Sequence, residues 1–385
     1  MFRSRRLLGL FLLVTGGILS ACQAGDSEET PTAFEATQTV QSAAQRAEET
    51  PSAQASVTAR PTRTLPPPTP TPPPGYYYNP VFDQDFPDPD ILTVEEDGQV
   101  VYYAYATNSQ GPSGGQVHVQ TARSTDLIQW TYVGDALPRL PRWVVQQFGY
   151  TWAPEVTRPA GGQGYVMYYT SRFAIEAGGV QCIGVATAET PEGPFTTVGE
   201  EPLVCQVGEG GSIDPAYFLD DDNTPYLLWK NDGNSQGGTT WIYIQRLSQD
   251  GFSLEGEATQ LIRADKAWEG ILVEGPTLWK HEGKYFLFYS ANDYASPRYA
   301  VGYAESEAIL GPYQKASEPL LKTNLKIGIV GPGGQDVVTA GDGQTWLLFH
   351  AWDAEAFRNL NLARLDWVDG KPVIDELARE AMQGP

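Results

Sequence analysis

The stretch from residue 88 to residue 108, DPDILTVEEDGQVVYYAYATN, carries the pattern that decides the fold. It opens with an acidic residue and a proline, continues as an apolar run, and turns at Asp97-Gly98 into a run rich in valine and tyrosine. An Asp-Gly pair favours a tight hairpin turn, and β-branched and aromatic residues favour strands. The stretch therefore predicts two antiparallel strands joined by a hairpin.

The same pattern returns four more times along the chain. The copies are APEVTRPAGGQGYVMYYTSR (153–172), DPAYFLDDDNTPYLLWKND (214–232), EGPTLWKHEGKYFLFYSAND (274–293) and GGQDVVTAGDGQTWLLFHAWD (333–353). They recur about every 60 residues, a long but feasible period for a four-stranded propeller blade with its loops. We therefore expect an all-β chain folded as a five-bladed β-propeller. The alternative, a β-sandwich with irregular strands, would not need equal spacing.

The first residues, MFRSRRLLGLFLLVTGGILSAC, are typical of an export signal. Arginines precede an apolar run from Leu7 to Leu19 that is short for a membrane span. The run ends in Leu19-Ser20-Ala21-Cys22, which resembles the processing box of bacterial lipoproteins. This resemblance implies removal of residues 1–21 and lipidation of Cys22 at the bacterial cell surface. An ordinary signal peptide with an incidental cysteine is the alternative.

Residues 22–75 have the composition of a spacer. They contain almost no aromatic residues and end in RPTRTLPPPTPTPPPG (60–75). Such a segment buries too little apolar surface to offset its ordering entropy, and its prolines favour extended polyproline II. We expect a disordered linker that holds a globular domain, residues 76–385, beyond the membrane.

The net charge of −22 argues against nucleic acid and anionic membrane surfaces as partners. The acidic balance fits a neutral ligand such as a sugar but does not identify one, and we expect a monomer that touches the membrane only through its lipid anchor. Besides Cys22, the chain contains only Cys182 and Cys205. In an exported protein such a pair favours a disulfide over two buried thiols.

Acidic residues stand at or near the start of four repeats, namely Asp88, Glu155, Asp214 and Glu274. The innermost strand of each propeller blade faces a central channel, so these side chains should converge there. Hydrolysis of a glycosidic bond needs one carboxyl group that protonates the leaving oxygen and another that activates water or attacks carbon. Crowded carboxylates raise one another's pKa, which suits a general acid at neutral pH. A wide channel favours the inverting arrangement, with carboxyl groups about 6.5–9.5 Å apart.

The chain resembles glycoside hydrolase family 43, the group of arabinofuranosidases, arabinanases and β-xylosidases. The matching stretches are NPVFDQDFPDPDI (79–91), WAPEV (152–156), SIDPAYFLDDDNTPYLLWK (212–230), VEGPTLWKHEGKYFLFYSA (273–291) and GPGGQDVVTAGDGQTWLLFHAW (331–352). Any one of these motifs is weak, but three acidic motifs in the order of the family make a specific signal. The resemblance spans essentially all of residues 76–385.

The resemblance implies a role for each of three acids. Asp88, in PDPDI, matches the general base that activates water, and Glu274, in VEGP, matches the general acid. Asp214, in SIDPA, matches the acid that orients the general acid and tunes its pKa. For each of them the alternative is a residue that caps a turn or pairs with an arginine. Asp90 lies two residues from Asp88 on the same face of a regular strand, but the motif favours Asp88.

Four further residues are candidates for substrate binding: Trp152, Glu155, Arg358 and Gln335. Trp152 could stack on a sugar or pack in the core, and Glu155 could hydrogen-bond the substrate or form a salt bridge at a blade edge. Arg358 resembles an arginine of the family's pocket, with a structural arginine as the alternative. Many members carry a histidine in the fifth-repeat motif near a central metal or water cluster. Here Gly334 and Gln335 replace it, which argues against an axial calcium ion, and Gln335 could hold the water cluster instead.

We therefore expect a metal-independent, inverting glycosidase without a cofactor. Its substrates would be α-L-arabinofuranosyl or β-D-xylosyl linkages in pentose-containing plant polysaccharides or oligosaccharides. A fructan-type five-bladed glycosidase is one alternative, although FPDPD (86–90) does not match the Asn-Asp-Pro-Asn-Gly context of that group. A surface lipoprotein that only captures sugars is another, although binding alone would not need three acids.

Overall fold

The computed structural model describes residues 72–111, 114–146, 150–173, 179–374, 377–378 and 380–385. Cys22 and the predicted linker up to residue 71 lie outside these residues. Within the described chain, regular structure consists of strands and short 3₁₀ turns. No helix in this part of the chain is long and apolar enough to cross a membrane.

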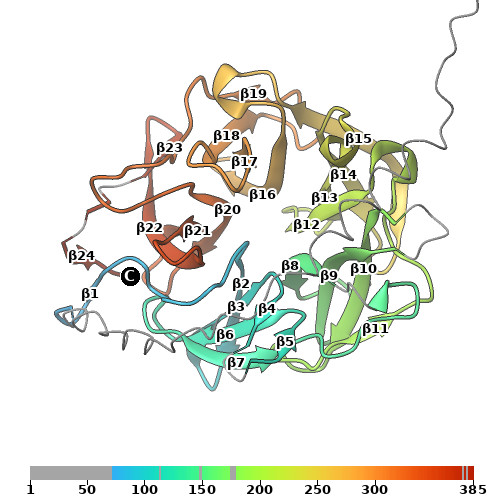
Figure 1. Cartoon of the computed structure of the whole chain (residues 1–385), viewed down its shortest axis with the longest axis horizontal. Coiled ribbons are helices and arrows are strands. Elements are labelled where there is room, and N and C mark those ends of the chain that lie inside the picture. The colour runs from blue at the N-terminus through green and yellow to red at the C-terminus, as the bar shows by residue number, and fades with distance from the viewer. Residues whose placement is uncertain (1–71, 112–113, 147–149, 174–178, 375–376, 379) are drawn as a thin grey trace, which may run out of the picture. The chain divides into compact units, whose positions relative to one another are not determined.

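Five four-stranded antiparallel sheets surround a common centre, which confirms the all-β, five-bladed propeller (Figure 1). Each blade begins with its innermost strand and continues outward in chain order. The innermost strands are β2 (Asp90–Glu96), β8 (Thr151–Thr157), β12 (Ser212–Leu219), β16 (Val273–His281) and β20 (Gly333–Thr339). The second strands are β3 (Gln99–Ala106), β9 (Tyr165–Arg172), β13 (Pro225–Asn231), β17 (Lys284–Ala291) and β21 (Thr345–Trp352). All ten strands lie where the repeats predict them.

The outer strands complete each blade. The third strands are β6 (Gln120–Ser124), β10 (Gln181–Ala188), β14 (Trp241–Leu247), β18 (Ala300–Ser306) and β22 (Arg358–Val368). The fourth are β7 (Thr131–Asp135), β11 (Thr196–Val198), β15 (Leu254–Arg263), β19 (Gln314–Lys315) and β23 (Lys371–Ile374). A short hairpin, β4 (Ser109–Gln110) with β5 (Gln116–Val117), projects from the first blade.

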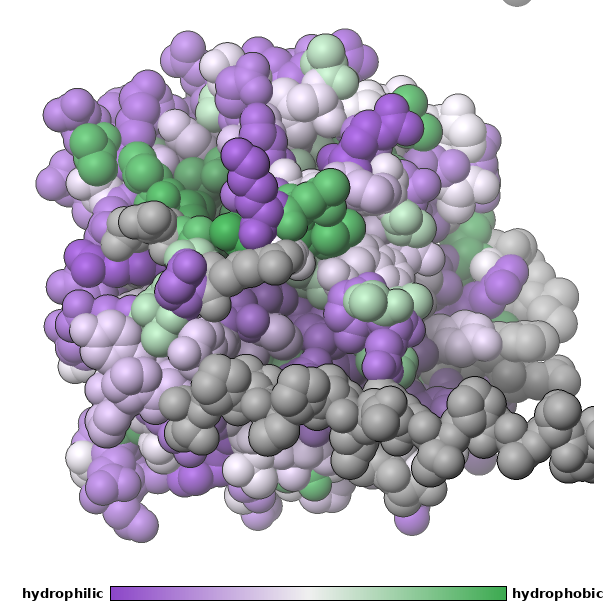
Figure 2. Space-filling model, turned by 60° about the vertical axis from the view of Figure 1, so that its left-hand side comes forward, coloured by the Kyte–Doolittle hydropathy of each residue, from purple (hydrophilic) through white to green (hydrophobic). Residues whose placement is uncertain are grey.

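The hydrophobic core lies between blades rather than within them. Five clusters of buried apolar side chains each join two neighbouring blades. In β3, Tyr103 and Tyr105 pack toward the second blade, whereas Tyr102 and Ala104 pack toward the fifth. Because both faces of such a strand are buried, it reads as a continuous apolar run. The face of the molecule in Figure 2 is mostly hydrophilic, and its apolar residues form small groups.

The N-terminal segment of the domain closes the ring against the last blade. β1 (Tyr76–Tyr77) pairs with β24 (Met382–Gln383) near the C-terminus. Further along, Asn79 exchanges two hydrogen bonds of 2.8 Å with the backbone of Leu362 in β22. The backbone N–H of Phe86 donates to the Arg358 carbonyl at 2.9 Å. The chain therefore reaches the first blade already attached to the fifth.

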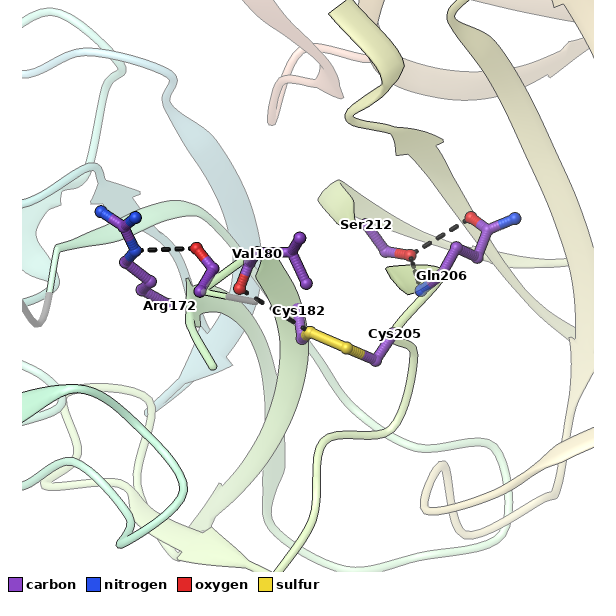
Figure 3. Close-up of a disulfide and its surroundings, with 7 residues drawn as sticks. Arg172, Val180, Cys182, Cys205, Gln206 and Ser212 are labelled. Carbon is purple, nitrogen blue, oxygen red and sulfur yellow. Dashed lines mark hydrogen bonds between the residues drawn. A yellow bond between two sulfur atoms is a disulfide. The ribbon is translucent and has the colours of Figure 1, made fainter. Parts of the chain in front are cut away.

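A disulfide ties the second blade to the connection that leads into the third. Cys182 in β10 bonds to Cys205, which precedes the 3₁₀ turn η3 (Val207–Glu209) (Figure 3). The next residue, Gln206, donates its backbone N–H to Ser212 Oγ at 3.1 Å and accepts the Trp229 indole N–H at 2.6 Å. The cross-link therefore anchors the chain a few residues before Asp214.

The disulfide should stabilise the fold by restricting the unfolded chain. It closes a loop with a sequence separation of 23 residues. For such a loop, chain entropy predicts a stabilisation of about 3 kcal/mol. We expect the Cys182→Ser/Cys205→Ser variant to lose about this free energy of unfolding, measured by denaturant titration. Wild type unfolded in reducing buffer serves as the control and should match the variant, whereas a variant as stable as the oxidised protein would contradict the prediction.

Candidate active site

A pocket opens at the centre of the propeller, and all five blades contribute to its wall. The three predicted catalytic acids and the four predicted substrate-binding residues all line it, namely Asp88, Asp214, Glu274, Trp152, Glu155, Gln335 and Arg358. Asp88 and Arg358 are 270 residues apart in sequence and are in direct contact here. The structure therefore brings every predicted pocket residue into one site.

A left-handed residue at the start of the inner strand shapes four of the five blades. Asp88 and Asp214 have φ angles of 54°, and the equivalent Gly275 and Gly334 have 55° and 53°. This conformation costs a residue with a side chain about 1 kcal/mol or more, and aspartate tolerates it better than most. In two blades, therefore, a catalytic candidate occupies a position where glycine would be easier to accommodate.

The carboxylate of Asp88 is held ionised. Arg358 Nη1 lies 3.3 and 3.2 Å from its two oxygens, and the Thr107 hydroxyl donates to Oδ2 at 2.7 Å. Burial alone would raise the pKa of Asp88, but Arg358 and the hydrogen bonds outweigh it and hold that pKa well below its usual range. Asp88 is therefore equipped to accept a proton rather than to donate one.

Three neighbours fix the position of Asp88 and Arg358. The Asp88 backbone N–H donates to Nδ1 of the fully buried His350 at 3.1 Å, and burial lowers the pKa of this histidine. The Arg358 guanidinium lies over the rings of Tyr294 and Trp352, 5.3 and 5.6 Å from their centroids. These contacts make Arg358 a pocket residue whose charge is directed at Asp88.

Glu274 and Asp214 form a second acidic group. Lys230 Nζ donates to Glu274 Oε2 at 2.9 Å, and the Tyr299 hydroxyl donates to Oε1 at 2.8 Å. The Gly275 N–H donates to Asp214 Oδ2 at 3.0 Å. Burial and the charge of Glu274 raise the pKa of Asp214 to about 7, against the opposing effect of Lys230. Asp214 therefore retains a proton close to neutral pH, next to the carboxyl group proposed as the acid catalyst.

A third group of carboxyls lies deeper in the pocket. Asp90 Oδ2 accepts the Val156 N–H at 2.8 Å, and Asp336 Oδ2 accepts the Ile91 N–H at 2.8 Å. Burial and the charge of Asp336 raise the pKa of Asp90, and burial together with the charges of Asp90 and Asp336 raises the pKa of Glu155. Burial also raises the pKa of Asp336 to about 7. Glu155 thus faces carboxyl groups at the channel.

Gln335 joins two blades at the centre. Its Nε2 donates to the Gly275 carbonyl at 2.7 Å, and its Oε1 accepts the Ser290 hydroxyl at 2.8 Å. A Cβ atom on Gly334 would lie 2.7 Å from both Asp88 Oδ1 and His350 Nδ1, so a histidine cannot occupy that position without displacing them. Among the described residues, no three His, Cys, Asp or Glu side chains are grouped to hold a metal ion. Independence from an axial calcium ion therefore stays a prediction from the sequence.

Sequence reasoning missed several residues that touch the acids, because they lie on the second and third strands or on the loop ahead of one. Lys230 and His350 interrupt the apolar runs YLLWK (226–230) and WLLFH (346–350). A charged or titratable residue in such a run indicates a partner inside the protein, because a buried charge needs one. Tyr299 gave no such signal. Trp152 is partly exposed on the pocket wall, which excludes a purely internal role.

Comparisons with known proteins agree with this site. The family model described as glycosyl hydrolases family 43 matches residues 77–372. Beta-D-galactofuranosidase xynD of Aspergillus niger is 28% identical over 284 residues, which cover 71% of this chain and 75% of that protein. The extracellular endo-alpha-(1->5)-L-arabinanase 1 of Bacillus subtilis is 26% identical over 288 residues, with coverages of 70% and 83%.

Solved structures extend the likeness. A thermostable family-43 glycoside hydrolase superposes with a TM-score of 0.69 and 32% identity, covering 80% of this chain and 99% of that chain.

The raised pKa of Asp214 predicts a pH dependence of stability. A folded-state pKa of about 7 lies above the unfolded value of 3.8, so the folded chain binds more protons between them and loses stability as pH rises through this window. The Asp214→Asn side chain stays neutral. We expect its melting temperature, relative to wild type, to increase from about pH 5 to about pH 8.

Asp220→Asn provides the control for this measurement. Although burial opposes it, hydrogen bonds from Lys280 and Tyr285 lower the pKa of Asp220, so the stability that this group contributes changes only at acidic pH. Its melting temperature should keep a constant offset from wild type over the same range. Parallel curves for Asp214→Asn and wild type would contradict the expected pKa of Asp214.

Proposed function

The chain belongs to family 43 of the glycosyl hydrolases, and on this premise we propose that it hydrolyses α-L-arabinofuranosyl or β-D-xylosyl linkages in pentose-containing polysaccharides by single-step inversion. The observation that carries the proposal is the difference in protonation within one pocket. Asp88 is kept ionised by Arg358, whereas Asp214, whose pKa is raised by burial and by the charge of Glu274, retains a proton close to neutral pH. An ionised base and a protonated acid are the two groups that inverting hydrolysis needs.

Under this proposal, one water molecule is consumed in one step. Asp88 accepts a proton from water while the water oxygen bonds to the anomeric carbon. The bond from that carbon to the leaving oxygen breaks, and Glu274 gives its proton to the leaving oxygen. Asp88 ends protonated and Glu274 ends ionised, and exchange with solvent restores both. Asp214 orients Glu274 and keeps the proton available to it.

The substrate class rests on the site together with the similar enzymes. Their names include an arabinanase and a galactofuranosidase. Trp152 and the half-exposed Tyr294 present aromatic faces at the pocket, which suit the apolar face of a sugar ring. We propose that the enzyme acts as a monomer without a cofactor, since the proton transfers use side chains alone.

The roles of the two acids can be separated with a panel of aryl α-L-arabinofuranosides, β-D-xylosides and β-D-galactofuranosides. On the substrate that wild type cleaves, Asp88→Asn should lose roughly 10²–10⁴-fold in kcat with every leaving group. Glu274→Gln should lose as much with poor leaving groups but little with activated ones, which need no proton. NMR of the anomeric proton should show product of inverted configuration.

Asp220→Asn is again the matched control. This aspartate directly follows β12, the inner strand that contains Asp214, and pairs with Lys280. It should keep wild-type kcat. Wild-type turnover of none of the three sugars, retention of anomeric configuration, or near-normal activity of Asp88→Asn would refute the proposed function.

We also propose that the mature protein is anchored by lipid at Cys22. The Leu-Ser-Ala-Cys sequence supports this, and the arabinanase relative is described as extracellular, which supports export. In a bacterial host, wild type should take up labelled palmitate and sediment with membranes. Cys22→Ala should lose the label and leave the membrane fraction, whereas equal labelling of both proteins would exclude this anchor.

A further inference from the structure

A buried lysine lies directly behind the proposed general acid. Lys230 is in β13, the second strand of the third blade, and only 1% of its side chain is exposed. Its Nζ is 2.9 Å from Glu274 Oε2 and 3.6 Å from Asp232 Oδ1. Burying an ammonium group is costly unless partners compensate for lost hydration. A lysine buried in β13 therefore requires compensating partners, and its position calls for a structural or functional explanation.

The strand register explains how Lys230 reaches the acid. Lys230 pairs with Ile213, the residue before Asp214, and the ladder is irregular between Ile213 and Ala216. Asp214 turns out of the strand at this irregularity with a φ of 54°. Burial opposes a charged Lys230, but Glu274, Asp214 and Asp232 outweigh it and raise its pKa, so the ammonium group stays charged.

The two oxygens of Glu274 have different surroundings. Oε2 faces Lys230, which does not line the pocket, whereas Oε1 faces Tyr299, which does. The other titratable groups around them are Asp214 and Asp232 on the third blade, with Asp88 and His350 on the opposite side. Lys230 is the cation that hydrogen-bonds Glu274 among the described residues.

Resting on the proposed function, we infer that Lys230 is the positioning residue of the general acid. It holds Oε2 at the back of the pocket and leaves Oε1, beside Tyr299, as the oxygen that carries the proton to the leaving group. Its charge has a second effect. Glu274, Asp214 and Asp232 share one ammonium group, and Lys230 opposes the rise in the pKa of Asp214 without abolishing it.

The test is Lys230→Met, which keeps an unbranched side chain one heavy atom shorter and removes the charge. Against aryl glycosides with poor leaving groups, kcat/KM should fall roughly 10²-fold, while activated leaving groups lose little. The alkaline limb of the kcat/KM profile should move up by about one pH unit, because the ammonium group no longer favours loss of the proton. Lys230→Arg should restore the limb to near its wild-type position.

Lys315→Met controls for the loss of a buried lysine. Lys315 is 4% exposed and pairs at 2.8 Å with the fully buried Glu269, which does not line the pocket. This variant should lose stability with no shift of the alkaline limb. If Lys230→Met loses activity equally with every leaving group and its limb does not move, Lys230 is only structural and the inference fails.

A double variant keeps the inference testable if Lys230→Met does not fold. Adding Lys230→Met to Glu274→Gln removes both charges of the pair, which is far less disruptive than removing one. Because Lys230 acts through Glu274, the double variant should be as active as Glu274→Gln alone. A further loss of tenfold or more in kcat/KM would overturn the inference. Wild type inactive on every substrate would instead refute the proposed function.

Discussion

The left-handed residue that begins the inner strand is the constraint on which the site depends. Asp88, Asp214, Gly275 and Gly334 share nearly the same φ angle in four different blades. A repeated backbone turn gives each blade an equivalent side-chain position at the channel, although the residues there differ. Where glycine occupies the turn, a neighbour supplies the polar group: Glu274 precedes Gly275 in the fourth blade, and Gln335 follows Gly334 in the fifth.

The same strand starts also hold the blades together at the centre. Asp336 accepts an N–H from the first blade, Asp90 accepts one from the second, and Asp214 accepts one from the fourth. Each of these carboxyl groups has a raised pKa because it is buried, so these groups oppose stability at alkaline pH. The large apolar clusters between blades offset this cost. The polar groups at the axis are therefore tolerated because large apolar clusters lie between the blades.

Much of the fold was predictable because a propeller repeats its local signals. Hairpin turns and strand starts depend on residues adjacent in sequence, and equal spacing then implies that Asp88, Asp214 and Glu274 meet. The partners of these acids were not predictable in the same way. Which side chain of a second strand points toward an acid depends on strand register and on the irregularity at Ile213 and Ala216. Lys230 therefore read as part of a core strand, and no pattern in the sequence indicated that Asp85 accepts the backbone N–H of Arg358.

The contacts that close the ring also bring the proposed general base, Asp88, next to Arg358. The segment that precedes Asp88 pairs with β22 of the fifth blade, and β22 begins at Arg358. Phe86 donates to the Arg358 carbonyl, and Asp85 accepts the Arg358 N–H at 3.1 Å. Attaching the first blade to the last therefore places Asp88 beside the guanidinium that keeps it ionised. An open ring would leave this carboxylate without its cation, so only the closed propeller contains a complete general base.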